Sequence, residues 1–159
     1  MTVKPTPVPM HVDQSEPLLL AVAEHLEAEE GRVPHAYIDS LGYLTIGVGR
    51  LIDQHRGGGL SEAEINLLLA NDIQKQIAGI RDWRAWERVR NDPVRSAALV
   101  AMAFQLGTAG LAKFTDTLAA VAKGSFDEAA LAMLDSHWAR QTPARAYRVA
   151  AMMRSGQPL

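Results

Sequence analysis

The sequence predicts an α+β protein that is mainly helical and contains one small antiparallel sheet. Apolar residues recur at helical spacing before residue 31 and again after residue 60, whereas glycine, tyrosine and β-branched residues concentrate between them. The 159 residues are 48% hydrophobic and carry both signs of charge, which is typical of one globular domain with a buried core. We therefore expect a single domain at residues 15–159. A β-containing lobe would span about 31–60, and the helical lobe would comprise helix 16–30 and residues 61–159.

The first helix is expected to end at Glu30. Residues 1–14 contain three prolines and no apolar periodicity, so we expect them to form a flexible leader. Ser15 can cap a helix whose first turn contains Pro17 and which stops before Gly31. The C-terminal end of a helix carries partial negative charge, so two adjacent glutamates in its last turn are unfavourable there. Their placement suggests that something other than stability selected them.

Short strands are predicted next. Glycines at positions 42, 47 and 49 divide residues 34–52 into β-rich pieces, YID and YLTIGVG, which favour a hairpin or a small antiparallel sheet. Residues 54–59 follow as a turn-rich loop. The motif RGGGL at positions 56–60 lacks the lysine of a phosphate-binding loop, so we interpret it as a flexible turn.

Helices are predicted for the rest of the chain. Ser61 and Glu64 form a capping-box pattern that opens a helix to about Ile80. The segment PVRSAALVAMAFQL is apolar nearly all round after its first turn, which indicates a core helix buried on most sides. One short helix is then expected to contain Trp83, Trp86 and Val89. Three more are expected to begin at Thr115, Ser125 and Thr142.

Composition argues against several functional classes. With no cysteine, neither a disulfide nor a thiolate metal site is possible. The five histidines show no metal-ligand spacing, so no metal and no cofactor are expected. The formal net charge of −2, without a clustered basic face, argues against a nucleic-acid partner. The longest apolar run, residues 97–104, is shorter than the roughly 20 residues of a membrane span, so no stable membrane insertion is expected. The three tryptophans are expected to lie in the core.

Glu30, Asp39 and Thr45 form the constellation that is most suggestive of chemistry. Hydrolysis of a glycosidic bond needs one carboxyl group that donates a proton and one carboxylate that stays ionised. The negative helix end favours a protonated Glu30, whereas backbone N–H groups in a polar turn can hold Asp39 as an anion. Purely structural roles stay open at this point, because Asp in turns, Glu near helix ends and Thr on strands are common.

Three segments carry a resemblance to a known family. The stretch EGRVPHAYIDSLGYLTIGVGRL resembles the catalytic segment of phage-type lysozymes, the T-even phage muramidase family. The segments AALVAMAFQLGTAGLAKFT (97–115) and FDEAALAMLDSHWARQTPARAYRV (126–149) resemble the family's central and later helices, in the same order. The resemblance covers about residues 19–156. It implies a two-lobed, lysozyme-like fold.

The resemblance also implies roles at the matching positions. Glu30 would be the general acid, Asp39 the second carboxylate, and Thr45 the hydroxyl that helps to hold the attacking water. Gly49 and Leu51 would line the cleft.

Further positions match on the helical lobe. Phe104, Gln105 and Thr117 correspond to family residues near the bound glycan. Arg145 corresponds to the arginine that braces the catalytic glutamate.

Some positions depart from the family pattern. Arg50 stands where some members have a histidine, and it would pair with Asp72. The stretch between Gly49 and Asp72 is shorter than in the T-even member, so a trimmed small lobe is expected. Ala132 falls where a family asparagine faces the glycan, which removes an amide partner from one sugar subsite.

The activity that the resemblance implies is that of a muramidase, which hydrolyses the β-1,4 bond between N-acetylmuramic acid and N-acetylglucosamine. Peptidoglycan strands would be its partner, and a monomer is expected. One alternative is a lytic transglycosylase, which cuts the same bond without an outside water and is distinguished by product mass. The other is a catalytically silent wall-binding or morphogenetic module.

Because no export signal is recognised, we expect the enzyme to stay in the host cytoplasm until it is released to the wall. A phage lysis protein, a prophage remnant and an antibacterial effector stay open as origins.

Overall fold

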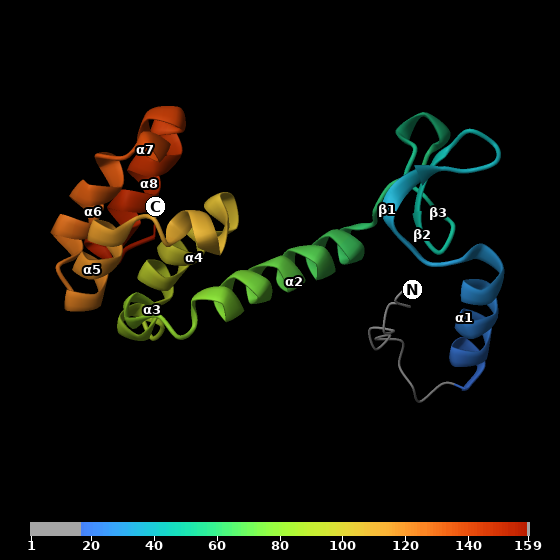
Figure 1. Ribbon diagram of the computed structural model, residues 1–159, viewed down its shortest axis with the longest axis horizontal. Coiled ribbons are helices and arrows are strands. Elements are labelled where there is room, and N and C mark those ends of the chain that lie inside the picture. Colours follow the sequence, from blue (N-terminus) through green and yellow to red (C-terminus); the bar gives the residue numbers. More distant parts are fainter. Residues whose placement is uncertain (1–16, 159) are drawn as a thin grey trace, which may run out of the picture. The chain divides into compact units, whose positions relative to one another are not determined.

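The computed structural model describes residues 17–158, and the predicted leader and the Ser15 cap lie outside the described residues. The chain divides into two compact units, Met1–Ala63 and Glu64–Leu159. Helices dominate, and the one sheet in the described part of the chain has three antiparallel strands (Figure 1). The predicted class, mainly helical α+β with a small sheet, is confirmed.

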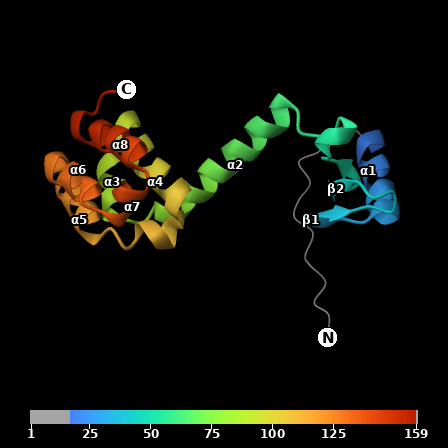
Figure 2. The ribbon, with the colours of Figure 1, turned by 90° about the horizontal axis from the view of Figure 1, so that it is seen from above.

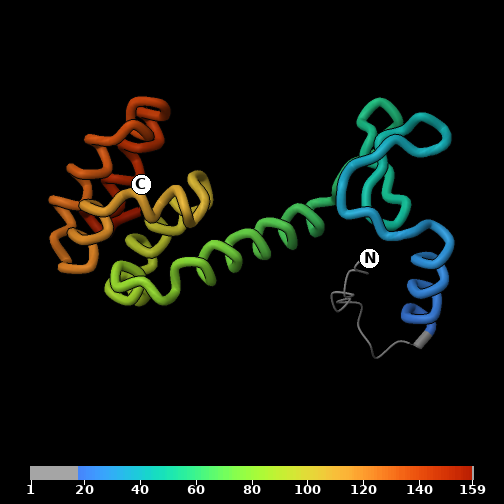
Figure 3. Tube along the Cα trace, in the orientation of Figure 1, coloured from blue at the N-terminus to red at the C-terminus, as the bar shows by residue number. Residues whose placement is uncertain are grey.

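The first unit joins one helix to the sheet. In chain order its elements are α1 (Pro17–Glu30), β1 (Val33–Ile38), β2 (Leu44–Gly47), β3 (Arg50–Leu51) and the 3₁₀ helix η1 (Gln54–Arg56). The sheet has the order β1-β2-β3, and its register pairs Thr45 with both Tyr37 and Leu51. Figure 3 follows the chain from β1 through the sheet into η1. The meander is short because glycines end β2 and open β3, as the sequence predicts.

Helix α1 ends where the sequence predicts. Gly31 adopts a left-handed conformation, with φ of 75°, and its N–H donates to the carbonyl of Glu27 at 3.1 Å. A glycine in this conformation is a common helix stop because it carries no Cβ. No basic residue lies in the last turn. Arg32, just beyond it, forms an ion pair with Glu27.

The second unit is helical, as Figures 1 and 2 show, and α3 and α8 pack against α4. Helix α8 packs against α4, α6 and α7, and α5 packs against α3 and α6. The helices of this unit are α2 (Glu62–Ile80), α3 (Arg84–Val89), α4 (Pro93–Leu111), α5 (Thr115–Lys123), α6 (Phe126–Leu134), α7 (His137–Gln141) and α8 (Pro143–Ser155).

The predicted core helix is α4. Its backbone leaves helical geometry at Gly107, with φ of 70°, so the regular part ends where the predicted apolar segment ends. The residues that it buries are Ala98, Leu99, Met102, Ala103 and Leu111. The prediction of burial on most sides needs one correction, because Ala97, Ala101 and Phe104 form an exposed stripe. By length and apolar composition alone, α4 could cross a membrane. Its role as the core helix of this unit accounts for that composition.

Two details of the helical unit differ from the prediction. Trp83 precedes α3 as its N-cap and does not lie within the helix. Helix α7 was not predicted, since its five residues are too few for a periodic pattern. Ser136 begins α7 by accepting a hydrogen bond from the N–H of Ala139 at 3.1 Å. The tryptophans pack as expected: Trp138 is buried, and Trp83 and Trp86 pack against the core.

Candidate active site

Asp39 sits in the turn that follows β1. Its Oδ1 accepts hydrogen bonds from the backbone N–H groups of Leu41, at 2.9 Å, and Tyr43, at 2.8 Å. The turn is closed by two backbone bonds, from Asp39 N–H to the Tyr43 carbonyl and from Gly42 N–H to the Asp39 carbonyl. The expectation that backbone N–H groups hold this carboxylate is therefore confirmed. One carboxylate oxygen is held by the turn, and Oδ2 is directed to a different partner.

That partner is Thr45 on β2. Its Oγ1 lies 3.4 Å from Asp39 Oδ2 and 3.2 Å from the Tyr43 carbonyl oxygen. A hydroxyl has one proton, so it donates to one of these oxygens at a time and keeps lone pairs free to accept. Thr45 is only 3% exposed, which fixes its rotamer by packing. The two residues thus form a pre-arranged carboxylate and hydroxyl pair.

Glu30 is the last residue of α1, and its side chain is exposed. A Cβ added to Gly49 would lie 3.6 Å from Glu30 Oε2, so the turn between β2 and β3 passes close beside this carboxyl group. Gly49 has φ of 67°, a conformation that disfavours any residue with a side chain. Leu51 follows on β3, paired with Thr45. The first unit therefore contains all five of these predicted residues, with Glu30 beside Gly49, Asp39 beside Thr45, and Thr45 paired with Leu51.

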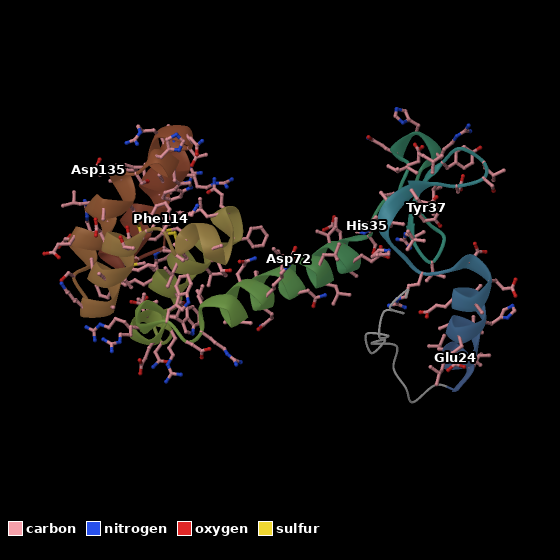
Figure 4. All side chains as sticks on the ribbon, viewed as in Figure 1. Glu24, His35, Tyr37, Asp72, Phe114 and Asp135 are labelled. Carbon is pink, nitrogen blue, oxygen red and sulfur yellow. The ribbon has the colours of Figure 1, made fainter. Side chains whose placement is uncertain are left out.

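Arg50 is anchored within its own unit, where its Nε donates to the carbonyl of Gly59 at 3.2 Å. Asp72 lies exposed on α2, as Figure 4 shows. The pairing of Arg50 with Asp72 stays a prediction.

Three predicted residues of the helical unit line one pocket. Phe104, Gln105 and Arg145 border a cavity of about 620 Å³ whose other walls are mainly apolar residues of α2, α4 and α8. Phe104 is 47% exposed. The Nε1–H of Trp138 donates to Gln105 Oε1 at 2.9 Å, which fixes the amide plane and leaves its NH₂ group to donate elsewhere.

Thr117 belongs to a different pocket, of about 450 Å³, which Ala132 also lines. Thr117 is 1% exposed, so it contributes to the pocket wall with very little surface. Phe114 and Asp135, labelled in Figure 4, lie in the same wall. The ring of Phe114 meets Trp138 edge-on at a centroid distance of 6.2 Å. The sequence did not predict that Phe114 and Asp135 line this pocket, because no local motif connects the two positions and only the fold brings them together.

Within residues 17–158, no three His, Asp or Glu side chains gather in an arrangement that could hold a metal ion. The chemical groups at hand are thus carboxylates, a hydroxyl and backbone N–H groups. Such a set suits proton transfer and the orientation of a water molecule.

A family model described as phage lysozyme matches residues 27–153. The chain belongs to the phage lysozyme family. It is 32% identical over 165 residues to the pre-baseplate central spike protein Gp5 of Enterobacteria phage T4, an alignment that covers 86% of this chain and 28% of that protein. This chain therefore spans less than a third of the spike protein.

Two shorter relatives are matched over nearly their whole length. Probable T4-type lysozymes 2 and 1 of Dictyostelium discoideum are 26% and 24% identical, and each alignment covers 87% of this chain and 96% of the relative. The predicted family is confirmed. Membership supports a lysozyme-type glycosidase and implies peptidoglycan as the substrate class.

Proposed function

We propose that this protein is a muramidase that hydrolyses the β-1,4 bond between N-acetylmuramic acid and N-acetylglucosamine. The observation that carries the proposal is the Asp39 turn. Two backbone N–H groups hold one carboxylate oxygen, and the other lies 3.4 Å from the buried Thr45 hydroxyl. A carboxylate held in this way has a fixed position from which it can activate a water or support a charged sugar.

Glu30 is proposed as the general acid. Its carboxyl group lies at the end of α1, and its Oε2 lies beside the turn at Gly49. The proton would pass to the glycosidic oxygen as the bond breaks. The bare backbone of Gly49 beside Glu30 leaves room for the sugar to approach.

Asp39 and Thr45 are proposed to hold the attacking water together. A carboxylate that attacks the sugar itself needs no partner hydroxyl, whereas a water needs a second hydrogen bond to fix its line of approach. Inverting glycosidases leave room for such a water, with the two carboxyl groups about 6.5–9.5 Å apart. The proposed mechanism is therefore inversion, with the proton of the water passing to Asp39.

Glycan binding is assigned to residues that match the family. Gly49 and Leu51 would contact the chain on the sheet side, and Phe104, Gln105 and Thr117 on the helical side. The exposed ring of Phe104 and the oriented amide of Gln105 support this assignment. Exposed aromatic rings pack against sugars, and an amide hydrogen-bonds their acetamido groups.

Supporting roles are proposed for three charged residues. Arg145 would brace Glu30, as the family resemblance implies, and Arg50 would pair with Asp72. The enzyme is proposed to act as a monomer. It would stay in the host cytoplasm until another protein opens the way to the wall.

The test is digestion of purified peptidoglycan, followed by mass spectrometry of the soluble fragments. Hydrolysis predicts fragments that carry one added water and a reducing end. Anhydro-muramic ends would show a transglycosylase. Intact walls that nevertheless retain bound protein would show a silent wall-binding module. Asp39→Asn serves as the matched variant, since it preserves the size of the side chain and removes its charge.

A further inference from the structure

Arg56, at the end of η1, lies over the ring of Tyr43, with Cζ 4.6 Å from the ring centroid. A guanidinium over an aromatic face is attracted by the ring's quadrupole. The two residues are thirteen positions apart and belong to different loops of the same unit. The contact therefore ties the turn after β3 to the turn after β1.

The turn that carries Arg56 is built from many hydrogen bonds. Asp53 accepts from His55 N–H with its side chain, and from the N–H groups of Arg56 and Gly58 with its carbonyl. A Cβ at Gly58 would come within 2.8 Å of both Asp53 N and the Leu51 carbonyl oxygen, so only glycine fits. The motif RGGGL, interpreted from sequence as a turn, forms a hydrogen-bonded turn that is tightly packed at Gly58 and presents one arginine.

Tyr43 is the residue through which this turn can reach the site. Its N–H donates to Asp39 Oδ1 at 2.8 Å, and its carbonyl accepts from Asp39 N–H at 2.9 Å. The same carbonyl oxygen lies 3.2 Å from Thr45 Oγ1. A shift of the Tyr43 peptide would thus move both groups that are proposed to hold the water.

We propose that Arg56 is a positioning residue that fixes the Asp39 and Thr45 pair by holding the Tyr43 ring. This inference rests on the proposed function, because it deepens the role of that pair. Arg56 acts through Tyr43 and touches no reacting atom. Loss of the contact should misplace the water and leave the glycan-binding surface intact, so the effect falls on kcat.

The experiment compares Arg56→Ala, Arg56→Lys and the control His55→Ala. His55 neighbours Arg56 in the same turn, and its side chain is 94% exposed. Two readouts are combined: kcat and KM on soluble glycan fragments, and hydrogen exchange of the Leu41 and Tyr43 amides by NMR. Arg56→Ala is expected to lower kcat about tenfold, with KM within about twofold of the wild type, and to speed exchange at Tyr43. Arg56→Lys keeps a cation over the ring and should restore most of kcat, and His55→Ala should match the wild type.

A second variant, Gly58→Ala, displaces the turn without altering Arg56 and should reproduce the fall in kcat. Thermal melting of each variant separates this effect from general unfolding. A rise in KM alone would overturn the proposal by showing that Arg56 contacts substrate. An unchanged kcat would also overturn it, as would a lower kcat with unchanged Tyr43 exchange. If the wild type releases no reducing ends, the proposed function fails, but amide exchange still decides whether Arg56 holds the Tyr43 turn.

Discussion

Replacing Asp92 removes the group that anchors the start of the core helix α4. Its Oδ1 accepts from the N–H groups of Val94, at 3.1 Å, and Arg95, at 3.0 Å, and its Oδ2 accepts from Arg95 Nη1 at 2.6 Å. Arg95 in turn donates to the carbonyls of Met153, at 2.9 Å, and Arg154, at 3.1 Å. One carboxylate thus caps α4 and orients the guanidinium that holds the end of α8.

The free energy of unfolding that is lost when Asp92 is replaced has two separable contributions, the helix cap and the ion pair. Loss of an N-cap costs about 1 kcal/mol. The ion pair adds about 1 kcal/mol, because the two side chains are 31% and 18% exposed and solvent weakens the attraction. Asp92→Ala should therefore lower the free energy of unfolding by about 2 kcal/mol. Asp92→Asn keeps a capping oxygen and should lower it by about 1 kcal/mol. At roughly 2–4 °C per kcal/mol, the melting shifts are measurable.

The effect also depends on pH. The backbone N–H of Arg95 lowers the pKa of Asp92 from 3.8, burial opposes this, and the Arg95 guanidinium and the Val94 N–H lower it further. Since the folded-state pKa lies below the unfolded one, the stabilisation is complete above about pH 4 and is lost as the pH falls through the folded value. The difference in melting temperature between the wild type and Asp92→Asn should therefore become smaller as the pH falls below about 4.

Thermal melting followed by circular dichroism at pH 7, 5 and 3 checks both points. An Asp92→Ala variant that melts with the wild type would refute the capping argument. If the wild type and Asp92→Asn differ in melting temperature as much at pH 3 as at pH 7, the stability assigned to the Asp92–Arg95 ion pair is refuted.

Three further predictions concern the proposed site. Glu30→Gln should abolish clearing of wall suspensions and leave the melting temperature equal or slightly higher, because it removes a charge at a negative helix end; lysis within a few-fold of wild type would remove Glu30 from its role. Arg145→Ala should lower lysis and cost at most about 1 kcal/mol of stability, because both Arg145 and its proposed partner Glu30 are exposed; full lysis would make Arg145 an ordinary surface residue. Thr45→Ala should lower kcat roughly 10- to 100-fold, while calorimetric glycan affinity persists. Thr45→Ser, which keeps the hydroxyl, should retain most of the rate, and an equal loss in both variants would contradict a role for the hydroxyl.

The sequence predicts what depends on neighbouring residues. The stop of α1 at Gly31 is a local backbone property, and the bonds from Leu41 and Tyr43 to Asp39 span at most four positions. Such features follow from residue type and spacing alone. For the same reason β2 falls within the predicted piece YLTIGVG. Strand β1 instead begins at Val33, four residues before the predicted piece YID, and β3 follows the predicted pieces.

Features that depend on packing between distant segments were not predictable in this way. The contact of Arg56 with Tyr43 requires two loops to meet, and nothing in RGGGL indicates which side chain it presents. Helix α7 is too short for periodicity to identify it. Its residue Trp138 binds Gln105 from thirty-three positions away, and only the fold determines such a pair.

The most direct test of inverting hydrolysis at Asp39 and Thr45 is proton NMR of a fresh peptidoglycan-fragment digest, recorded before the anomers interconvert. Attack by a water held opposite the leaving oxygen predicts that the α-anomer of the new reducing end appears first and that the β-anomer grows in later. The β-anomer appearing first would mean a retaining reaction and would contradict the proposed role of Thr45. Products without a reducing-end signal would contradict hydrolysis itself.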